Sequence, residues 1–204
     1  MEVIQYTSIY PVIGTNINNQ NTVFFSPTAG LKQSTVLTGV KNFYWIGRIS
    51  SAGSSYTNPF YSMLGTDNVI NTNYLPWLGS NYGSKYMNPG YASSGILGAT
   101  ASQYTTDANA VVNTGFSNVN FPLTGNVALL SVNGITEGNG TTSYQGLCYD
   151  RGAHIGWCGD LGEVLIFSNA LTSQQHRQVE GYLAWKWGLQ STLPSTHAYA
   201  KTPP

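Results

Sequence analysis

The sequence predicts an all-β fold, a two-sheet antiparallel β-sandwich with one short C-terminal helix. Short runs of aromatic and β-branched residues recur along the chain and are bounded by Gly, Asn, Ser or Pro, which is the pattern of strands and turns. Many short strands with such turns are typical of sandwiches. One long stretch has helical periodicity. No internal repeat or linker-like stretch divides the 204 residues, so one domain is expected.

Four segments predict the main strands. They are "TVFF" (22–25), "NFYWIGRIS" (42–50), "VALLSVNG" (127–134) and "GEVLIFS" (162–168). "FYWIGRI" and "EVLIF" are apolar on both faces of an extended chain, so we expect central strands that are covered on both sides. The segment 51–94 has few such runs and many turn residues, and we expect it to consist mostly of loops.

The segment 171–189, "LTSQQHRQVEGYLAWKWGL", predicts the helix, at about residues 172–187. Thr172 and Gln175 have the spacing of a capping box, in which each side chain bonds the backbone of the other residue. Gly188 is expected to end the helix in a left-handed conformation.

The two tryptophans of this helix are expected to serve different surfaces. Helical spacing places Trp187 on one face with Leu183 and Val179, and this face is expected to close the core. His176 lies on the same face and is expected to be a hydrogen-bonded structural histidine. Trp185 projects from the other side, and the tail "STLPSTHAYAKTPP" is expected to fold back over it.

The two cysteines, Cys148 and Cys158, lie in "CYDRGAHIGWC". Their spacing permits a disulfide across a hairpin or two buried free thiols, and the sequence leaves both open. No further Cys or clustered His lies nearby, so a zinc site is not expected. We expect no cofactor. Asp67, Asn68 or Asp150 could offer oxygen ligands to calcium, but no EF-hand-like spacing supports such a site.

Charge is scarce and balanced. Eight Lys and Arg residues match eight Asp and Glu residues, and charged residues make up 8% of the chain. Without a basic stripe, nucleic acid is not an expected partner. No apolar run approaches the roughly 18 residues of a membrane span, so no membrane insertion is expected. The start of the chain lacks the pattern of a secretory signal. The Asn, Ser, Thr and Tyr content is typical of extracellular or virion-surface β proteins.

The segment "GDLGEVLIFSNALTSQQHRQVEGYLAWKWGLQSTLPSTHAYAKTPP" (159–204) resembles the closing part of concanavalin A-like, laminin-G-like jelly-roll domains. The segments 18–49 and "FYSMLGTDN" (60–68) resemble that group more loosely. The resemblance implies a jelly roll over residues 21–204, with residues 1–20 as an N-terminal strand or arm. Such domains usually open with a further strand before "TVFF", which here is shortened, replaced by "VIQYTSIYPVI", or supplied by another chain.

Catalysis is not expected. A glycosidase needs two carboxylates about 5–10 Å apart. The acidic residues are Glu2, Asp67, Asp107, Glu137, Asp150, Asp160, Glu163 and Glu180. No strand carries the Glu-x-Asp-x-x-Glu pattern of related glucanases, and Asp160 and Glu163 are expected on opposite faces of their strand, as structural hydrogen-bonding residues. His154, His176 and His197 have no nucleophile-elbow context.

The segment "NTNYLPWLGSNYGSKYMNPGY" (71–91) contains the candidate binding residues, because aromatic rings stack on sugars or partner surfaces and amides orient a ligand. The candidates are Tyr74, Trp77, Asn81, Tyr82, Tyr86 and Tyr91. The same aromatic residues could instead fill a long loop or a subunit interface.

We therefore expect a non-catalytic module that recognises a glycan or a protein on a surface. The alternative is a structural virion protein, of a capsid or appendage, whose aromatic loops contact neighbouring subunits. A glycan hydrolase is the least supported class.

Overall fold

The computed structural model describes residues 10–26, 29–50, 60–65, 78–81, 87–88, 96–105, 111–113, 125–137, 143–148 and 157–204. Within these residues the chain forms two β-sheets and one α-helix, which confirms the predicted all-β, two-sheet class. Every pairing between the described strands is antiparallel.

One sheet has seven strands in the order β1-β2-β12-β4-β10-β8-β9. Their bounds are β1 (Val12–Ile13), β2 (Val23–Phe25), β12 (Gly159–Phe167), β4 (Asn42–Ile49), β10 (Val127–Glu137), β8 (Ile96–Thr105) and β9 (Val111–Asn113). The other sheet has five strands in the order β3-β11-β5-β6-β7. Their bounds are β3 (Leu31–Thr38), β11 (Ser143–Leu147), β5 (Phe60–Gly65), β6 (Leu78–Asn81) and β7 (Met87–Asn88).

Strands β2, β4, β10 and β12 overlap the four predicted segments, although β12 begins three residues earlier and β10 ends three residues later than predicted. The expectation of loops in the segment 51–94 is wrong for three parts of it, because β5, β6 and β7 lie there. Sequences such as "LGSN" in β6 contain Gly and Ser, which have low strand propensity. These residues form strands because a neighbouring strand pairs with them.

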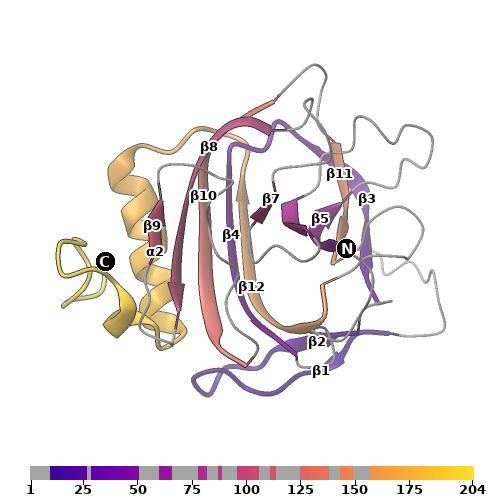
Figure 1. Ribbon diagram of the computed structural model, residues 1–204, viewed down its shortest axis with the longest axis horizontal. Helices are drawn as coiled ribbons and strands as arrows, with labels where there is room; N and C mark the ends of the chain where they lie inside the picture. The colour runs from indigo at the N-terminus through magenta and orange to yellow at the C-terminus, as the bar shows by residue number, and fades with distance from the viewer. Residues whose placement is uncertain are drawn as a thin grey trace.

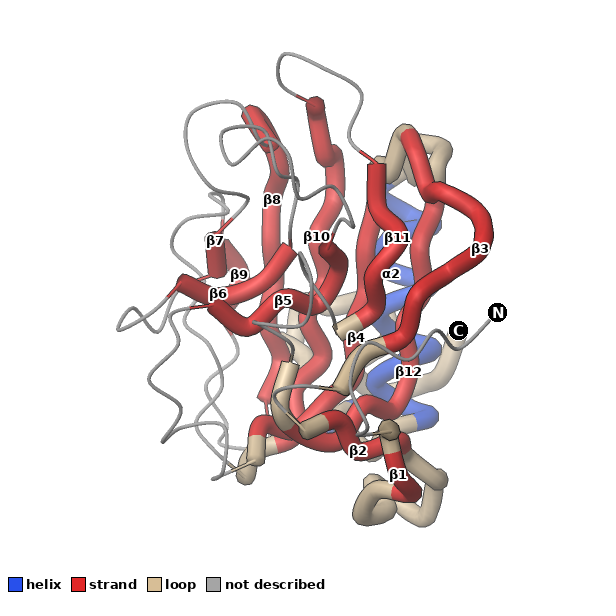
Figure 2. Tube along the Cα trace, turned by 90° about the vertical axis from the view of Figure 1, so that its right-hand side faces the viewer, coloured by secondary structure: helices blue, strands red, loops and turns tan. Residues whose placement is uncertain are grey.

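The seven-stranded sheet is the middle layer of the molecule. The five-stranded sheet covers one of its faces, and α2 (Ser173–Lys186) packs on the other (Figures 1 and 2). In β4, Phe43 and Trp45 belong to the core between the sheets, whereas Tyr44 and Ile46 belong to a second core beneath the helix. All four side chains are at most 1% exposed, so β4 is a central strand covered on both sides, as predicted.

Helix α2 begins and ends where the sequence predicts. The Thr172 side chain accepts the backbone N–H of Gln175, and the Gln175 side chain accepts the N–H of Thr172, so the capping box is complete. Gly188 follows with φ +75°, a left-handed conformation that glycine adopts without steric cost. A short 3-10 turn, η2 (Gln190–Thr192), comes next.

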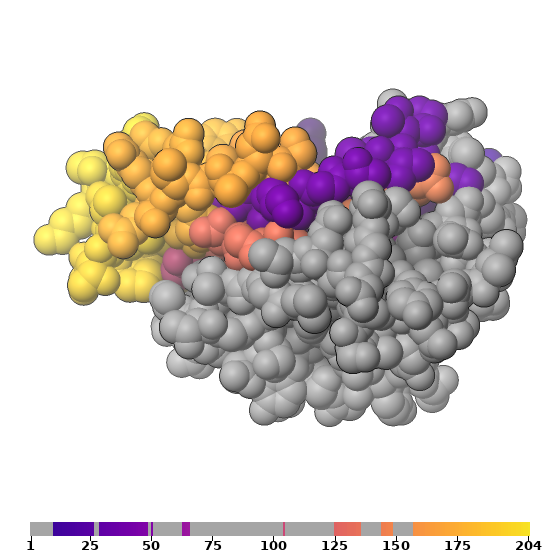
Figure 3. Space-filling view, turned by 90° about the horizontal axis from the view of Figure 1, so that it is seen from above, coloured from indigo at the N-terminus to yellow at the C-terminus, as the bar shows by residue number. Residues whose placement is uncertain are grey.

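The predicted core face of the helix is confirmed. Leu183 and Trp187 are buried in the core beneath the helix, and Val179 packs against it while partly exposed. The tail covers Trp185 as predicted, because the Trp185 Nε1–H donates to the Tyr199 carbonyl at 2.8 Å. Figure 3 shows the helix and tail, orange to yellow, together at one side of the molecule.

The N-terminal residues 10–20, part of the predicted strand or arm, contribute β1 at the edge of the seven-stranded sheet. Residues 1–9 lie outside the described residues. Cys148 and Cys158 are both buried, and neither forms a disulfide. Of the two alternatives that the sequence left open, the structure therefore has two buried free thiols.

Candidate functional site

The predicted binding residues fall largely outside the part of the chain that the structure describes. Tyr74, Trp77, Tyr82, Tyr86 and Tyr91 are in that group. Asn81 is the last residue of β6, where its backbone pairs with Phe60, and its side chain lies outside the description. Strands β6 and β7 pair at Ser80 and Met87, so the two chain ends that flank residues 82–86 lie beside each other.

A buried carboxylate, Glu180, joins the helix to the sheet and to the tail. It is 3% exposed. Its Oε1 accepts from the Ser131 hydroxyl of β10 at 2.5 Å and lies 3.2 Å from His176 Nε2 on the same helix. Its Oε2 lies 3.2 Å from Nε2 of His197 in the tail.

The hydrogen-bond directions in this Glu180 network follow from its carboxylate. An ionised carboxylate only accepts, so both histidines present Nε2–H to Glu180. The Nδ1 of His176 then accepts from the Tyr44 hydroxyl, and the Nδ1 of His197 accepts from the Tyr199 backbone N–H. The Nε2–H of each histidine therefore has an acceptor in Glu180, and the Nδ1 of each has a donor of its own. The prediction that His176 is a hydrogen-bonded structural histidine is confirmed.

The Glu180 network shifts the pKa values of two of its own groups, Glu180 and Tyr44. Burial raises the pKa of Glu180, but hydrogen bonds from His176, His197 and Ser131 and the charge of His176 outweigh it and lower the pKa to about 2. Burial, and then the charge of Glu180, raise the pKa of the Tyr44 phenol well above its ordinary range. Perturbed groups often mark active sites. Here Tyr44 and Ser131 are fully buried, so no substrate reaches them, and the network fastens the helix and tail to the sheet.

Two further carboxylates are held in structural contacts. Asp160 Oδ2 accepts from the Arg48 Nη2 at 2.7 Å, and its Oδ1 accepts from the Thr15 backbone N–H at 2.9 Å. Glu163 Oε2 accepts from the Trp187 Nε1–H at 2.7 Å and lies 3.0 Å from the Lys186 Nζ. Hydrogen bonds to Tyr182 and Glu163 raise the pKa of Lys186. The predicted structural roles of Asp160 and Glu163 are confirmed.

The prediction that Asp160 and Glu163 lie on opposite faces of the strand is wrong. Asp160 pairs with Arg48 and Glu163 with Ile46, and these partners are two residues apart on β4. Residues two apart face the same side of a strand. A β-bulge between Leu161 and Glu163 inserts one extra residue, which turns Glu163 to the helix side. The two carboxylates nevertheless bond different partners, because Asp160 bonds Arg48 and Glu163 bonds Trp187.

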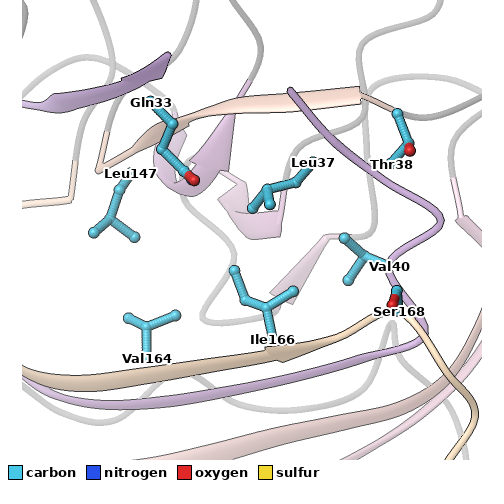
Figure 4. Close-up of a pocket in the computed structure, with 8 residues that line it drawn as sticks. All are labelled: Gln33, Leu37, Thr38, Val40, Leu147, Val164, Ile166 and Ser168. Carbon is cyan, nitrogen blue, oxygen red and sulfur yellow. The ribbon is translucent and has the colours of Figure 1, made fainter. Parts of the chain in front are cut away.

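An apolar cleft opens between the two sheets, with a volume of about 370 Å³. Its aliphatic walls are Leu37, Val40, Leu147, Val164 and Ile166, and its polar atoms come from Gln33, Thr38 and Ser168. In Figure 4, Val164 and Ile166 point from β12 into the space toward Leu37 and Leu147. Among the described residues, no charged side chain and no aromatic ring lines the cleft. Its walls suit apolar side chains or aliphatic ligands better than sugar rings, which stack on aromatic faces.

The sequence predicts neither the Glu180 network nor the cleft. One signal for the network was present, because His176 and Glu180 are four residues apart on the helix and so lie on one face. The other partners, Tyr44, Ser131 and His197, are distant in the sequence. The cleft has no local signal, since strands far apart in the chain build it.

Among the described residues, no group of three His, Cys, Asp or Glu side chains is placed to hold a metal ion. The calcium candidates Asp67, Asn68 and Asp150, together with Glu2, Asp107 and His154, lie outside these residues, as does the side chain of Glu137. Within the described chain, no helix has the length and apolar character that a membrane crossing requires.

Comparison of the chain with protein-family models, with curated proteins and with solved structures gave no match.

Proposed function

We propose that this chain is a non-catalytic recognition module with concanavalin A-like jelly-roll topology, which binds a glycan or a protein at an extracellular or virion surface. The proposal that the module is non-catalytic rests on one observation, which is that the described carboxylates are already hydrogen-bonded within the fold. Asp160, Glu163 and Glu180 each accept hydrogen bonds from structural partners that join the strands, the helix and the N-terminal segment, so these carboxylates already have a role in the fold.

The described strands nearest in sequence to the candidate binding residues belong to the five-stranded sheet, and α2 does not pack on this sheet. Strands β6 and β7, which flank residues 82–86, are at one end of the five-stranded sheet, and α2 and the tail occupy the other sheet. Aromatic residues among Asn, Ser and Gly provide rigid contact area together with adaptable hydrogen bonds. This segment has that composition, and it supports a binding role for Trp77 and Tyr82 in particular.

Binding to a broad glycan array, followed by titration of any positive glycan, tests the proposal. We expect saturable binding that weakens by about 2 kcal/mol or more in Trp77→Ala or Tyr82→Ala, as for aromatic residues at the centre of an interface. Tyr182→Ala is the matched control, because Tyr182 is an exposed tyrosine on the helix. It should bind as the wild type does.

Two results would contradict the proposal. Release of sugar from a bound glycan would identify a hydrolase. Equal binding by the Trp77→Ala, Tyr82→Ala and unsubstituted proteins would remove the aromatic segment from the binding surface.

A further inference from the structure

Over more than half of its length, strand β12 has a described partner strand on one side alone, and its other side is called the open edge. At Gly159–Leu161 it pairs with β2 on one side and β4 on the other. From Glu163 to Phe167 it pairs with β4, and no other described strand lies on its second side. Exposure follows the pairing, because the first three residues of β12 are buried and the last six are partly exposed.

The open part of β12 has the composition of a strand enclosed on both faces. Val164 and Ile166 face the cleft and pack on the core between the sheets, whereas Leu165 and Phe167 pack on the core beneath the helix. A strand that is apolar on both faces is typical of a sheet interior. Edge strands of monomeric proteins usually carry charges that prevent pairing, and Val164–Phe167 carries none.

The cleft side of this edge is also uncharged, because no charged side chain is among the described residues that line the cleft. The neighbouring strands β1 and β2 expose apolar side chains, including Ile13 at 88% and Val12 at 57%. Residues 10–26 contain no charged residue at all. The one charge on the open part of β12, Glu163, already bonds Trp187 and Lys186 on the helix side.

We propose that β12 pairs antiparallel with β12 of a second copy of this chain, about a twofold axis perpendicular to the seven-stranded sheet. The partner strand must be apolar on both faces and must itself have a free edge, and Glu163–Phe167 meets both conditions. In such an isologous contact each open backbone group meets its counterpart in the other copy. The proposal is independent of the recognition function.

The pairing register follows from the geometry. A perpendicular twofold axis keeps the cleft faces of both copies on one side of the joined sheet, so cleft-facing residues must pair with cleft-facing residues. Pairing of all five residues requires the axis to pass beside Leu165. Leu165 then faces Leu165 of the second copy, and Val164 faces Ile166. The sheet becomes continuous through both copies, and the two clefts lie next to each other.

Analytical ultracentrifugation over a concentration series tests the contact. We expect a monomer–dimer equilibrium for the wild type. In Leu165→Lys the dimer dissociation constant should rise by about tenfold or more, because like charges would face each other across the axis. Val36→Lys is the matched control, since Val36 is a partly exposed apolar residue on β3. It should dimerise as the wild type does. A monomeric wild type at the highest soluble concentration overturns the proposal.

Cysteine trapping gives a second measurement in case Leu165→Lys fails to fold. Residues directly opposite each other in an antiparallel contact have Cα atoms about 4.5–5.5 Å apart, within the Cα range of a disulfide. Leu165→Cys should therefore form a disulfide-linked dimer under mild oxidation. Val164→Cys and Ile166→Cys should not, because each is about 7–8 Å from its own counterpart. Equal cross-linking of all three variants, or of none, contradicts the proposed register.

Hydrogen exchange shows whether the open edge of β12 is covered by a second copy of the chain or by a segment of the same chain. Outward amides of Glu163–Phe167 should become more protected as concentration rises. Protection that is the same at all concentrations in a monomer would mean that a segment of the same chain covers the edge, and would overturn the proposal.

Discussion

Glu180 shows how one residue can connect three parts of a fold. A buried carboxylate is costly unless hydrogen bonds compensate it. Here Ser131 of the sheet, His176 of the helix and His197 of the tail all converge on it. Loss of any one partner would leave a buried acceptor with fewer donors, so the contacts at Glu180 depend on one another.

Acid should weaken the fold through Glu180. The folded protein lowers its pKa from the ordinary 4.5 to about 2, so the unfolded chain holds the proton more tightly. The resulting stability is therefore fully present above pH 4.5 and is lost as the pH falls toward 2. Urea unfolding of wild type and Glu180→Gln across this window should show the wild type losing its advantage. Parallel curves for the two proteins would contradict the assignment.

The roles of single residues were predictable where the signal was local. The capping pair Thr172 and Gln175 and the left-handed Gly188 are encoded within a few positions, and all three are confirmed. The orientation of Glu163 was not predictable, because a β-bulge reverses the alternation of faces and depends on pairing with a distant strand.

At the scale of elements, the bulge in β12 and the end of α2 fit each other. A Cβ atom on Gly162 would lie 2.7 Å from the Trp187 ring, closer than atoms pack. Glycine at the bulge thus permits the tryptophan ring to approach the strand closely. The next residue, Glu163, accepts the hydrogen bond of the same ring. The bulge therefore provides both the space and the acceptor for Trp187.

Gly162→Ala should destabilise the protein by about 1–3 kcal/mol, as overpacking does. The ring atoms nearest to the added methyl group are absent from phenylalanine. In a Trp187→Phe background the cost should therefore fall, with a coupling energy on the order of 1 kcal/mol in a double-mutant cycle of urea unfolding. Additive costs would show that the methyl group and the ring do not meet.

The elements themselves were predicted unevenly. Strands β4, β10 and β12 are rich in aromatic and branched residues, and the sequence predicts them well. Strands β3 ("LKQSTVLT") and β11 ("SYQGL") are more polar and were not predicted. Their strand structure depends on pairing with each other, a long-range contact that local propensity does not contain.

At the scale of the whole molecule, the reactivity of the two thiols measures whether the β-sandwich is folded. Cys148 follows β11 and Cys158 precedes β12, and each is at most 1% exposed. Burial raises the pKa of Cys158 to about 11 and that of Cys148 well above its ordinary value. Both groups therefore remain protonated and shielded in the folded protein.

Neither thiol should react with Ellman's reagent under native conditions, and both should react once denaturant unfolds the chain. The reaction should follow global unfolding, because exposure of either residue requires the sheets to separate. Val36→Cys provides a positive control, since its thiol would sit at a partly exposed position of β3. Rapid reaction of the native wild type would show that the sandwich opens locally.

The strand order has a consequence for the growing polypeptide. Strand β4 lies between β10 and β12, and β12 comes from residues 159–167, far along the chain. A nascent chain or a degradation product that stops before residue 159 therefore leaves β4 at an edge, with Tyr44 and Ile46 lacking the helix that covers them. Such an apolar edge readily pairs with another chain. Products that stop before residue 159 should thus aggregate more readily than the chain through residue 204, which a sedimentation assay of the two expressed forms can measure.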